Sequence, residues 1–479
     1  MKINNDLYKA NNSTVDLLLP AIFVAIDYFA IIIAEYMAYE LRNTIVGNHF
    51  FHISLACFWF VNPVVFIAFL HIGQLYNSRM QFWKLIEKIF YVTVYGIVAI
   101  VLFLYVAQTA SSTSRLFIAL LWLFSFILLV CGRYVVKKII ENVPCLQIPV
   151  LIIGAGKTAE LLIKGIMNDS GMGYKIIGFL EDYQVILKSL KQYPVLGNFN
   201  QAEEIISKTG VQNVIIAAPG MEETKLTELV NKIQSKVKNL TIIPNLIDIP
   251  MNGIEAEGFF NEKIMLLRLK NNLARPLNRL IKYSFDFVGT LIGTILISPI
   301  LAIIAVWISL DSPGPIIFTH TRIGKDGKPF GCYKFRTMCI DAQERLEKLL
   351  ASDPIVRQEW EQDFKLKNDP RITKVGKFLR RTSLDELPQI FNVLKGEMSL
   401  VGPRPVIADE LPRYGEYLDD YLMVRPGITG MWQVNGRSDT TYDERVRMDS
   451  WYVRNWSFWI DIMLLWRTVK SVFMCKGAY

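Results

Sequence analysis

The sequence predicts an α/β membrane protein: a four-helix transmembrane bundle, a Rossmann-like doubly wound parallel sheet domain, and a mostly helical, membrane-associated domain with a re-entrant helix. Three observations predict this. Four apolar runs of bilayer-crossing length crowd the first third of the chain. Strand and helix patterns alternate in the middle, and a further apolar run flanked by basic residues opens the last part. The expected domains are 1–146, 147–270 and 271–479.

The composition is typical of a membrane protein that handles anions. Of the 479 residues, 52% are hydrophobic, and the formal net charge is +8. A basic protein suits contact with anionic lipid or with phosphate groups, and a merely solvated basic surface is the alternative. The six cysteines form no CxxC pair and the four histidines have no metal-ligand spacing, so we expect neither a zinc site nor a disulfide framework. We expect no nucleic-acid partner.

The four apolar runs lie near 16–39, 53–72, 86–107 and 115–132. Lysine and arginine gather in the loop after the second run and in the tail after the fourth, and the other two loops hold few. Both ends of this bundle should therefore face the cytoplasm. Asp27 and Glu35 lie inside the first run, where packing in the bundle interior or near lipid headgroups is favoured over a functional role.

The middle domain contains a GxGxxA turn formed by Gly154, Gly156 and Ala159 between an expected strand and an expected helix. Such a turn lets a pyrophosphate approach a helix N-terminus, and Glu181 or Asp182 could hold ribose hydroxyls. A short-chain nucleotide-sugar enzyme would also need a Tyr-x-x-x-Lys pair, which the domain lacks. A structural or regulatory domain is therefore favoured, and nucleotide binding stays open.

The fifth apolar run, 284–310, is expected to enter the membrane and return to the same side. Ser298 and Pro299 lie in its middle, where proline removes an amide donor and clashes with the preceding turn. Basic residues flank both ends, which indicates that both ends stay in the cytoplasm. The alternative is an ordinary kinked span.

The last domain places carboxylates among cations at the membrane surface. A short hairpin is expected within 312–338, followed by a basic helical stretch, 365–381, that suits the headgroup layer. Thr382 or Ser383 should then cap a helix that begins at Leu384 and has Asp385 and Glu386 in its first turn.

Those two acids have two interpretations. Compensation of the helix dipole is the ordinary one. However, Arg380 and Arg381 precede the acids, and Arg404 follows in a Gly-Pro-Arg-Pro turn. Adjacent carboxylates surrounded by arginines suit a divalent metal and a diphosphate, so Asp385 and Glu386 are the candidate metal ligands.

Three long stretches carry a family resemblance. They are GPIIFTHTRIGKDGKPFGCYKFRTM, RRTSLDELPQIFNVLKGEMSLVGPRP and RPGITGMWQVNGR. With them the chain resembles the bacterial polyprenyl-phosphate sugar-1-phosphate transferases, and its domain order resembles the large subgroup that includes undecaprenyl-phosphate galactose phosphotransferase. The likeness extends over the full length and is weakest in the first 140 residues. Glu397 is a mild departure where Asp is commoner.

The resemblance implies roles for residues of the last domain. Asp385 matches the nucleophile and Glu386 its partner, Arg380 and Arg404 match phosphate-holding arginines beside Arg381, and the implied metal is Mg²⁺. Ser298 and Pro299 match the break in a re-entrant membrane helix.

The implied reaction moves a hexose 1-phosphate, galactose 1-phosphate first, from a UDP-sugar to undecaprenyl phosphate through a covalent aspartyl intermediate and releases UMP. A UDP-glucose or N-acetylhexosamine donor is the alternative. The reaction would open O-antigen, capsule or exopolysaccharide synthesis at the bacterial inner membrane, with both large domains in the cytoplasm.

The turn-rich segment 425–430 could shape a nucleotide mouth. After it, Gln433, Asn435 and Arg437 offer amide and guanidinium groups for a uracil edge or a phosphate, and plain loop structure is the alternative. The likeness and the non-catalytic middle domain lead us to expect a homodimer. A redox enzyme built on the Gly154 turn and a non-catalytic membrane scaffold are the competing functions.

Overall fold

The computed structural model describes residues 5–47, 54–76, 80–109, 113–168, 173–182, 187–245, 255–259, 264–269, 271–352, 369–435 and 440–473. The chain divides into two compact units, Met1–Ile247 and Asp248–Tyr479. Short 3₁₀ turns join the larger elements at Pro144–Leu146, Lys188–Leu190, Phe199–Gln201, Gln234–Lys236 and Lys325–Gly327.

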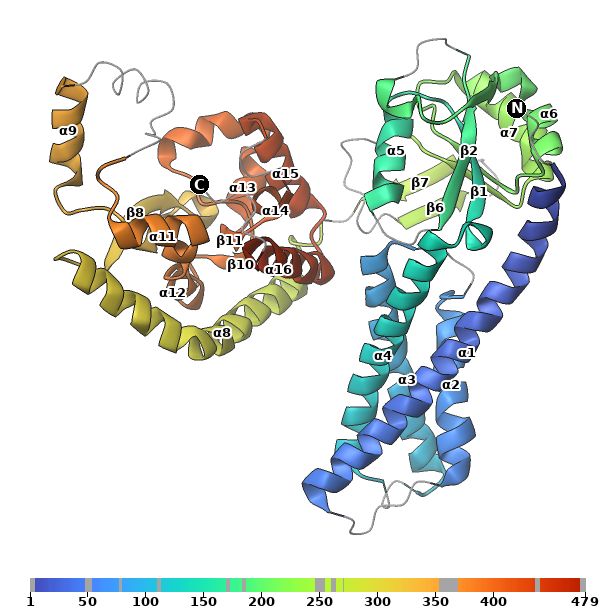
Figure 1. The fold of residues 1–479 in the computed structure, drawn as a ribbon, viewed down its shortest axis with the longest axis horizontal. Coiled ribbons are helices and arrows are strands. Elements are labelled where there is room, and N and C mark those ends of the chain that lie inside the picture. The colour runs from blue at the N-terminus through green and yellow to red at the C-terminus, as the bar shows by residue number, and fades with distance from the viewer. Residues whose placement is uncertain are drawn as a thin grey trace. The chain divides into compact units, whose positions relative to one another are not determined.

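The first unit begins with a helical bundle (Figure 1). Its helices are α1 (Asn5–Val46), α2 (Asn62–Ile72) after a π-helical turn at Cys57–Val61, α3 (Phe82–Val106) and α4 (Arg115–Asn142). Within the described residues, four helices are long and apolar enough to cross a membrane: three in this bundle, Leu19–Val46, Phe82–Val106 and Arg115–Asn142, and Pro276–Asp311 in the second unit. The expected second span corresponds to a shorter apolar helix, Cys57–Ile72.

The acids of the first span pack inside the bundle, as expected. Asp27 is buried and accepts a 2.5 Å hydrogen bond from Arg133 of α4, whose guanidinium also lies over the ring of Phe23. Glu35 is buried and accepts a 2.5 Å hydrogen bond from Asn62 of α2. A buried charge needs such a partner, and these contacts tie α1 to its neighbours.

The same unit continues into a five-stranded parallel sheet, which confirms the doubly wound prediction. The strands are β1 (Ile148–Ile153), β2 (Tyr174–Leu180), β3 (Val195–Gly197), β4 (Asn213–Ile216) and β5 (Asn239–Ile242), in the spatial order β3-β2-β1-β4-β5. Helices α5 (Lys157–Asn168), α6 (Ala202–Thr209) and α7 (Glu223–Ile233) connect them. Apolar clusters on both faces form the core, because parallel strands are covered on both sides.

Over the residues that the structure describes, the second unit contains three two-stranded sheets, one long helix and several short helices. An antiparallel hairpin of β6 (Glu255–Phe259) and β7 (Ile264–Arg268) precedes the long helix α8 (Pro276–Asp311). The hairpin expected within 312–338 is present as β8 (Ile317–Ile323) and β9 (Pro329–Phe335). A parallel pair, β10 (Ser399–Val401) and β11 (Gly427–Thr429), follows later in the chain.

The helical segments of this unit follow in chain order. They are α9 (Ala342–Ser352), α11 (Lys374–Thr382), a 3₁₀ turn at Leu384–Glu386, α12 (Gln389–Leu394), a 3₁₀ segment at Ala408–Tyr417, α13 (Leu418–Met423), α14 (Met431–Asn435), α15 (Tyr442–Arg454) and α16 (Phe458–Phe473).

Helix α8 is bent along its length and contains Pro299 (Figure 1). Most of its apolar side chains are exposed, on both sides of the proline. Its N-terminal half is anchored by Lys282, which donates to the carboxylate of Asp461 at 2.8 Å and to the carbonyl of Val401 at 3.0 Å. An apolar surface of this extent on a bent helix suits contact with lipid.

Candidate active site

Asp385 and Glu386 lie in a 3₁₀ turn between α11 and α12. The predicted cap is wrong. Ser383 adopts a left-handed conformation (φ 56°) and makes no capping bond, and the Thr382 hydroxyl donates to the carbonyls of Phe378 and Leu379. Because Ser383 ends α11 in this conformation, the acids lie in the tight turn between two helices, and α12 itself begins at Gln389.

Glu386 is held by a lysine that the sequence interpretation missed. The ammonium of Lys334, in β9, donates to the Glu386 carboxylate at 2.7 Å, and both side chains are partly exposed. Asn392 of α12 holds β9 in place: its side chain accepts from the Tyr333 amide at 3.0 Å and donates to the Gly331 carbonyl at 2.7 Å. The sequence feature that could have indicated Lys334 is its position as the one charged residue of an otherwise uncharged strand.

The two acids have opposite electrostatic environments. Burial, and next the charge of Glu386, raise the pKa of Asp385 to about 6, against the opposing pull of Lys334 and Arg380. Burial also acts to raise the pKa of Glu386, but Lys334, Arg404 and Arg322 together lower it below its usual value. Glu386 therefore stays ionised while Asp385 titrates closer to neutrality, as expected of a functional pair.

Arg380 faces the pair from the last turn of α11. Its guanidinium donates to the hydroxyl of Thr337 at 2.9 Å and interacts electrostatically with Asp385. A close approach fixes this helix, because a Cβ on Gly376 would lie 2.1 Å from the Thr337 carbonyl oxygen. Arg381 is exposed, and within the described residues no ion pair joins it to the acids.

Arg404 reaches the pair from the turn after β10. Burial, and next the neighbouring Arg445, lower the pKa of its guanidinium, against the opposing pull of Glu386. The segment 425–430, expected to be turn-rich, contains strand β11. Its parallel pairing with β10 sets it beside the Gly-Pro-Arg-Pro turn, with the Gly427 amide donating to the Pro403 carbonyl at 2.8 Å. A Cβ on Gly427 would lie 2.1 Å from the Gly402 nitrogen, so glycine is required there.

The predicted nucleotide-reading residues lie on α14 or beyond it. The Gln433 amide donates to the Ile428 carbonyl at 3.5 Å, and the exposed Asn435 accepts from Arg467 at 3.1 Å. Arg437 lies outside the described residues. Gln433 and Asn435 thus lie on the helix that directly follows β11. Their role in binding a nucleotide stays a prediction.

The acid pair fits the Mg²⁺ that the resemblance implies. Within the described part of the chain, no group of three or more His, Cys, Asp or Glu side chains could hold a metal. Mg²⁺, however, commonly binds through one or two carboxylates and takes its other ligands from water and substrate phosphates. Asp385 and Glu386 are close enough for one charge to raise the pKa of the other, and a divalent cation would relieve that repulsion.

The glycine turn of the middle domain forms as predicted. Gly154 has a positive φ of 100° and packs against the Ala217 carbonyl, Ala159 is buried, and a Cβ on Gly156 would meet open space. The Glu181 carboxylate accepts a 2.5 Å hydrogen bond from the Ala155 amide within this turn. A carboxylate therefore already lies against an amide that a bound phosphate would use.

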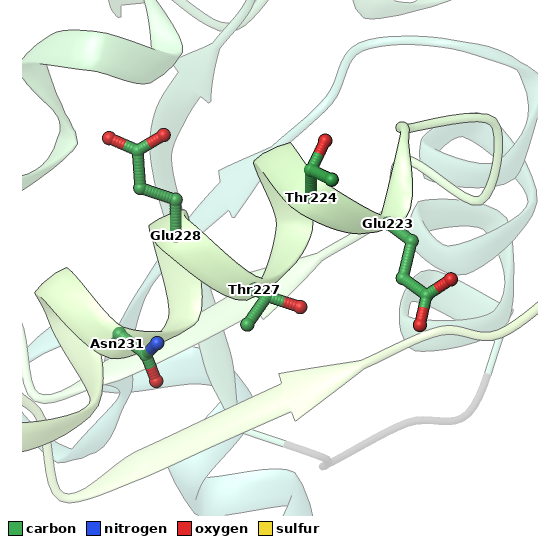
Figure 2. A pocket seen from close by; sticks show the side chains of 5 residues that line it. All are labelled: Glu223, Thr224, Thr227, Glu228 and Asn231. Atoms are coloured by element: carbon green, nitrogen blue, oxygen red, sulfur yellow. The ribbon is translucent and has the colours of Figure 1, made fainter.

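A shallow pocket on α7 is a weaker candidate. Figure 2 shows its five lining side chains, all exposed and all from one helix: Glu223, Thr224, Thr227, Glu228 and Asn231. Glu228 is already paired with Lys232 at 2.6 Å. No cation or nucleophile from a second element joins these residues in the pocket lining, so the acid pair of the second unit is the candidate active site.

The acid pair lies within a part of the chain that matches a known protein family. Residues 277–475 match the family described as bacterial sugar transferase, and residues 71–244 match a CoA-binding domain family. The chain is 38% identical, over 93% of its length and 91% of the relative's, to an undecaprenyl-phosphate galactose phosphotransferase of Salmonella typhimurium. A UDP-galactose-lipid carrier transferase of Erwinia amylovora is 39% identical over 84% of both chains.

A further relative has a different sugar in its name. The UDP-glucose:undecaprenyl-phosphate glucose-1-phosphate transferase of Escherichia coli is 34% identical over 69% of this chain and 68% of its own.

Proposed function

Because this chain belongs to the bacterial sugar transferase family, we propose that it transfers galactose 1-phosphate from UDP-galactose to undecaprenyl phosphate and releases UMP. The enzyme class, an undecaprenyl-phosphate sugar phosphotransferase, follows from the family and its relatives. Galactose is the finer proposal and rests on the two galactose-named relatives, which cover more of the chain than the glucose-named one. UDP-glucose is the runner-up.

The observation that carries the proposal is the convergence of charge at the acid pair. Asp385 and Glu386 meet Lys334 from β9, Arg380 from α11 and Arg404 from the turn after β10. With Arg322, which also acts on Glu386, four cations surround two carboxylates. This arrangement suits a dianionic diphosphate that must approach an anionic nucleophile.

In the first step, a carboxylate oxygen of Asp385 attacks the phosphorus that bears the sugar. The bond from that phosphorus to the bridging oxygen breaks, and UMP leaves with the electron pair. In the second step, a phosphate oxygen of undecaprenyl phosphate attacks the same phosphorus, and the Asp385 carboxylate is released. Covalent catalysis of this kind divides one difficult transfer into two and does not require both substrates to be bound at once.

The surrounding residues keep this chemistry possible. Arg380 and Arg404 offset the negative charge of the diphosphate, and Lys334 keeps Glu386 ionised beside the reacting carboxylate. Asp385 and Glu386 would hold Mg²⁺, which when bound stabilises charge on the phosphate oxygens. One phosphoanhydride replaces another, so the reaction should be close to equilibrium and reversed by UMP.

The features of α8 support a location of the site on the cytoplasmic side of the membrane. The bend, the exposed apolar residues on both sides of Pro299 and the basic flanks support a helix that enters and leaves on the cytoplasmic side of the inner membrane. Both large domains would then face the cytoplasm, where UDP-sugars are made. The product would begin a lipid-linked O-antigen, capsule or exopolysaccharide.

A donor panel tests the proposed function. Purified protein with undecaprenyl phosphate and Mg²⁺ is offered UDP-galactose, UDP-glucose and N-acetylated UDP-hexosamines, and UMP release is measured. UDP-galactose should give the highest kcat/KM, because the relatives that match most of the chain act on galactose by name. UMP release with N-acetylated donors alone would overturn the sugar assignment.

A further inference from the structure

The backbone around Arg404 is fixed on both sides. The Pro403 carbonyl accepts from the Gly427 amide at 2.8 Å, and the Val406 carbonyl accepts from the Ile323 amide at 2.8 Å. The backbone amide of Arg404 also interacts electrostatically with the carboxylate of Asp449 in α15. The start of the side chain is therefore rigidly placed, and the direction of its guanidinium depends on what surrounds that group.

A second buried cation lies next to this guanidinium. Arg445 is only 7% exposed, is paired with Glu410 at 3.5 Å, and interacts electrostatically with Arg404. Two like charges in a poorly hydrated site repel, so Arg445 acts to push the Arg404 guanidinium away. Glu386 attracts Arg404, and Glu410 attracts it as well. Without a further contact, Arg404 could turn to Glu410 or to solvent instead of the acid pair.

The indole of Trp432 supplies that contact. The Arg404 guanidinium carbon lies 5.3 Å from the centre of the Trp432 ring, and that of Arg445 lies 5.2 Å from it. Tryptophan is the aromatic side chain that attracts cations most strongly, and a ring shared by two cations reduces the cost of keeping them close. The indole nitrogen donates to the Thr440 hydroxyl at 2.7 Å, which fixes the ring from the segment directly before α15.

We propose that Trp432 is a positioning residue that holds the Arg404 guanidinium toward the acid pair against the repulsion of Arg445. The inference rests on the proposed function in one respect: Arg404 is the group that binds the diphosphate. Trp432 touches neither the reacting phosphorus nor the acids in this scheme, so its effect on the substrate passes through Arg404 alone.

The first test compares ring variants by calorimetric titration with UDP in Mg²⁺ on the full-length protein. Trp432→Leu removes the ring and should weaken UDP binding about tenfold. Trp432→Phe and Trp432→Tyr keep an aromatic ring, so their affinities for UDP should lie between those of the wild type and Trp432→Leu. Thr440→Val removes the indole hydrogen bond but keeps the ring, so it should weaken UDP binding less than Trp432→Leu does.

The decisive test is a double-mutant cycle with Arg404→Gln. If Trp432 acts through Arg404, Trp432→Leu should weaken UDP binding in the wild-type background and have no further effect in Arg404→Gln. Equal weakening in both backgrounds would overturn the inference, as would a Phe variant as weak as Leu. If the Leu variant does not fold, the cycle is run with Trp432→Phe and judged by the same criterion. UMP release by the wild type separately tests the proposed function, since UDP binding is measured without turnover.

Discussion

At the scale of single residues, the two neighbouring acids differ in pKa: that of Asp385 is raised and that of Glu386 is lowered. Lys334 contacts Glu386 directly and lowers the pKa of both carboxyl groups, whereas burial raises the pKa of Asp385 to about 6. Asp385 must be ionised to attack phosphorus, so its protonation limits the reaction on the acid side. Glu386 remains charged over the same range, which leaves Asp385 as the group that titrates.

The pH profile should follow this division. Because the nucleophile is the deprotonated form and its pKa is raised to about 6, kcat/KM should reach a plateau at neutral pH and fall about tenfold per pH unit below 6. Lys334→Met should move this acid limb to higher pH, since it removes a cation that lowers the pKa of Asp385. Lys328→Met, an exposed lysine in the same hairpin, is the control and should leave the limb unchanged. An unchanged limb in Lys334→Met would contradict this account.

Asp385, Glu386, Arg380 and Arg404 could be chosen from the sequence because adjacent acids near arginines stand out in a linear string. Lys334 could not, because its partner is 52 residues away and the contact of β9 with Asn392 of α12 holds its strand at the site. The capping prediction failed for a local reason. Serine is a good capping residue in general, but here Ser383 is the left-handed residue that ends α11.

At the scale of elements, close backbone contact positions α11. Helix α11 carries Arg380, and Gly376 lets the helix approach the backbone at Thr337, two residues after β9, to a distance that admits no side chain. Parallel strands and apolar helices were predictable from periodicity. This approach was not, because a glycine in a helix looks unfavourable until its neighbour is known.

Gly376→Ala should therefore damage both stability and activity. The added Cβ would lie 2.1 Å from a backbone oxygen, which can be relieved only by moving α11. We expect a loss of about 1–3 kcal/mol in the free energy of unfolding and a lower kcat as Arg380 shifts. Gly165→Ala in α5, where a Cβ meets open space, is the matched control and should be neutral or stabilising by up to ~1 kcal/mol. Equal stability of the two variants in thermal unfolding would contradict the packing argument.

Helix α8 gives a second prediction at this scale. If it enters and leaves on one side, cysteines introduced before Arg279 and after Asp311 should react with a membrane-impermeant thiol reagent from the same side. The wild type, treated in parallel, reports labelling of the native cysteines. Labelling of the two positions from opposite sides would mean a kinked span and would separate the acid pair from cytoplasmic UDP-sugars.

At the scale of the whole molecule, the residues of the proposed mechanism belong to one unit. The acid pair and its cations lie within Asp248–Tyr479, whereas the glycine turn lies in Met1–Ile247 and has the Glu181 carboxylate against it. The middle domain has a nucleotide-binding fold without a catalytic base, so we infer an assembly role, with a homodimer as the proposed state. The sequence predicted the parallel sheet because strand and helix alternate over short distances.

Deletion of residues 148–268 should leave measurable transfer activity, because no residue of the proposed mechanism is removed. Size-exclusion chromatography with light scattering should show that the full-length protein is a dimer and that the shortened protein associates less. Complete loss of UMP release from a shortened protein that is still folded would contradict an assembly role for the middle domain.

The central claim is that Asp385 carries the sugar phosphate, and adduct trapping tests it most directly. Protein is incubated with labelled UDP-galactose and Mg²⁺ without lipid acceptor, quenched and digested, and the peptide that contains Asp385 is analysed by mass spectrometry. We predict a hexose phosphate on Asp385 that disappears when undecaprenyl phosphate is added, no adduct in Asp385→Asn, and parallel double-reciprocal plots for the wild type. An active enzyme with no trapped adduct and intersecting plots would contradict the account and indicate direct transfer between the two bound substrates.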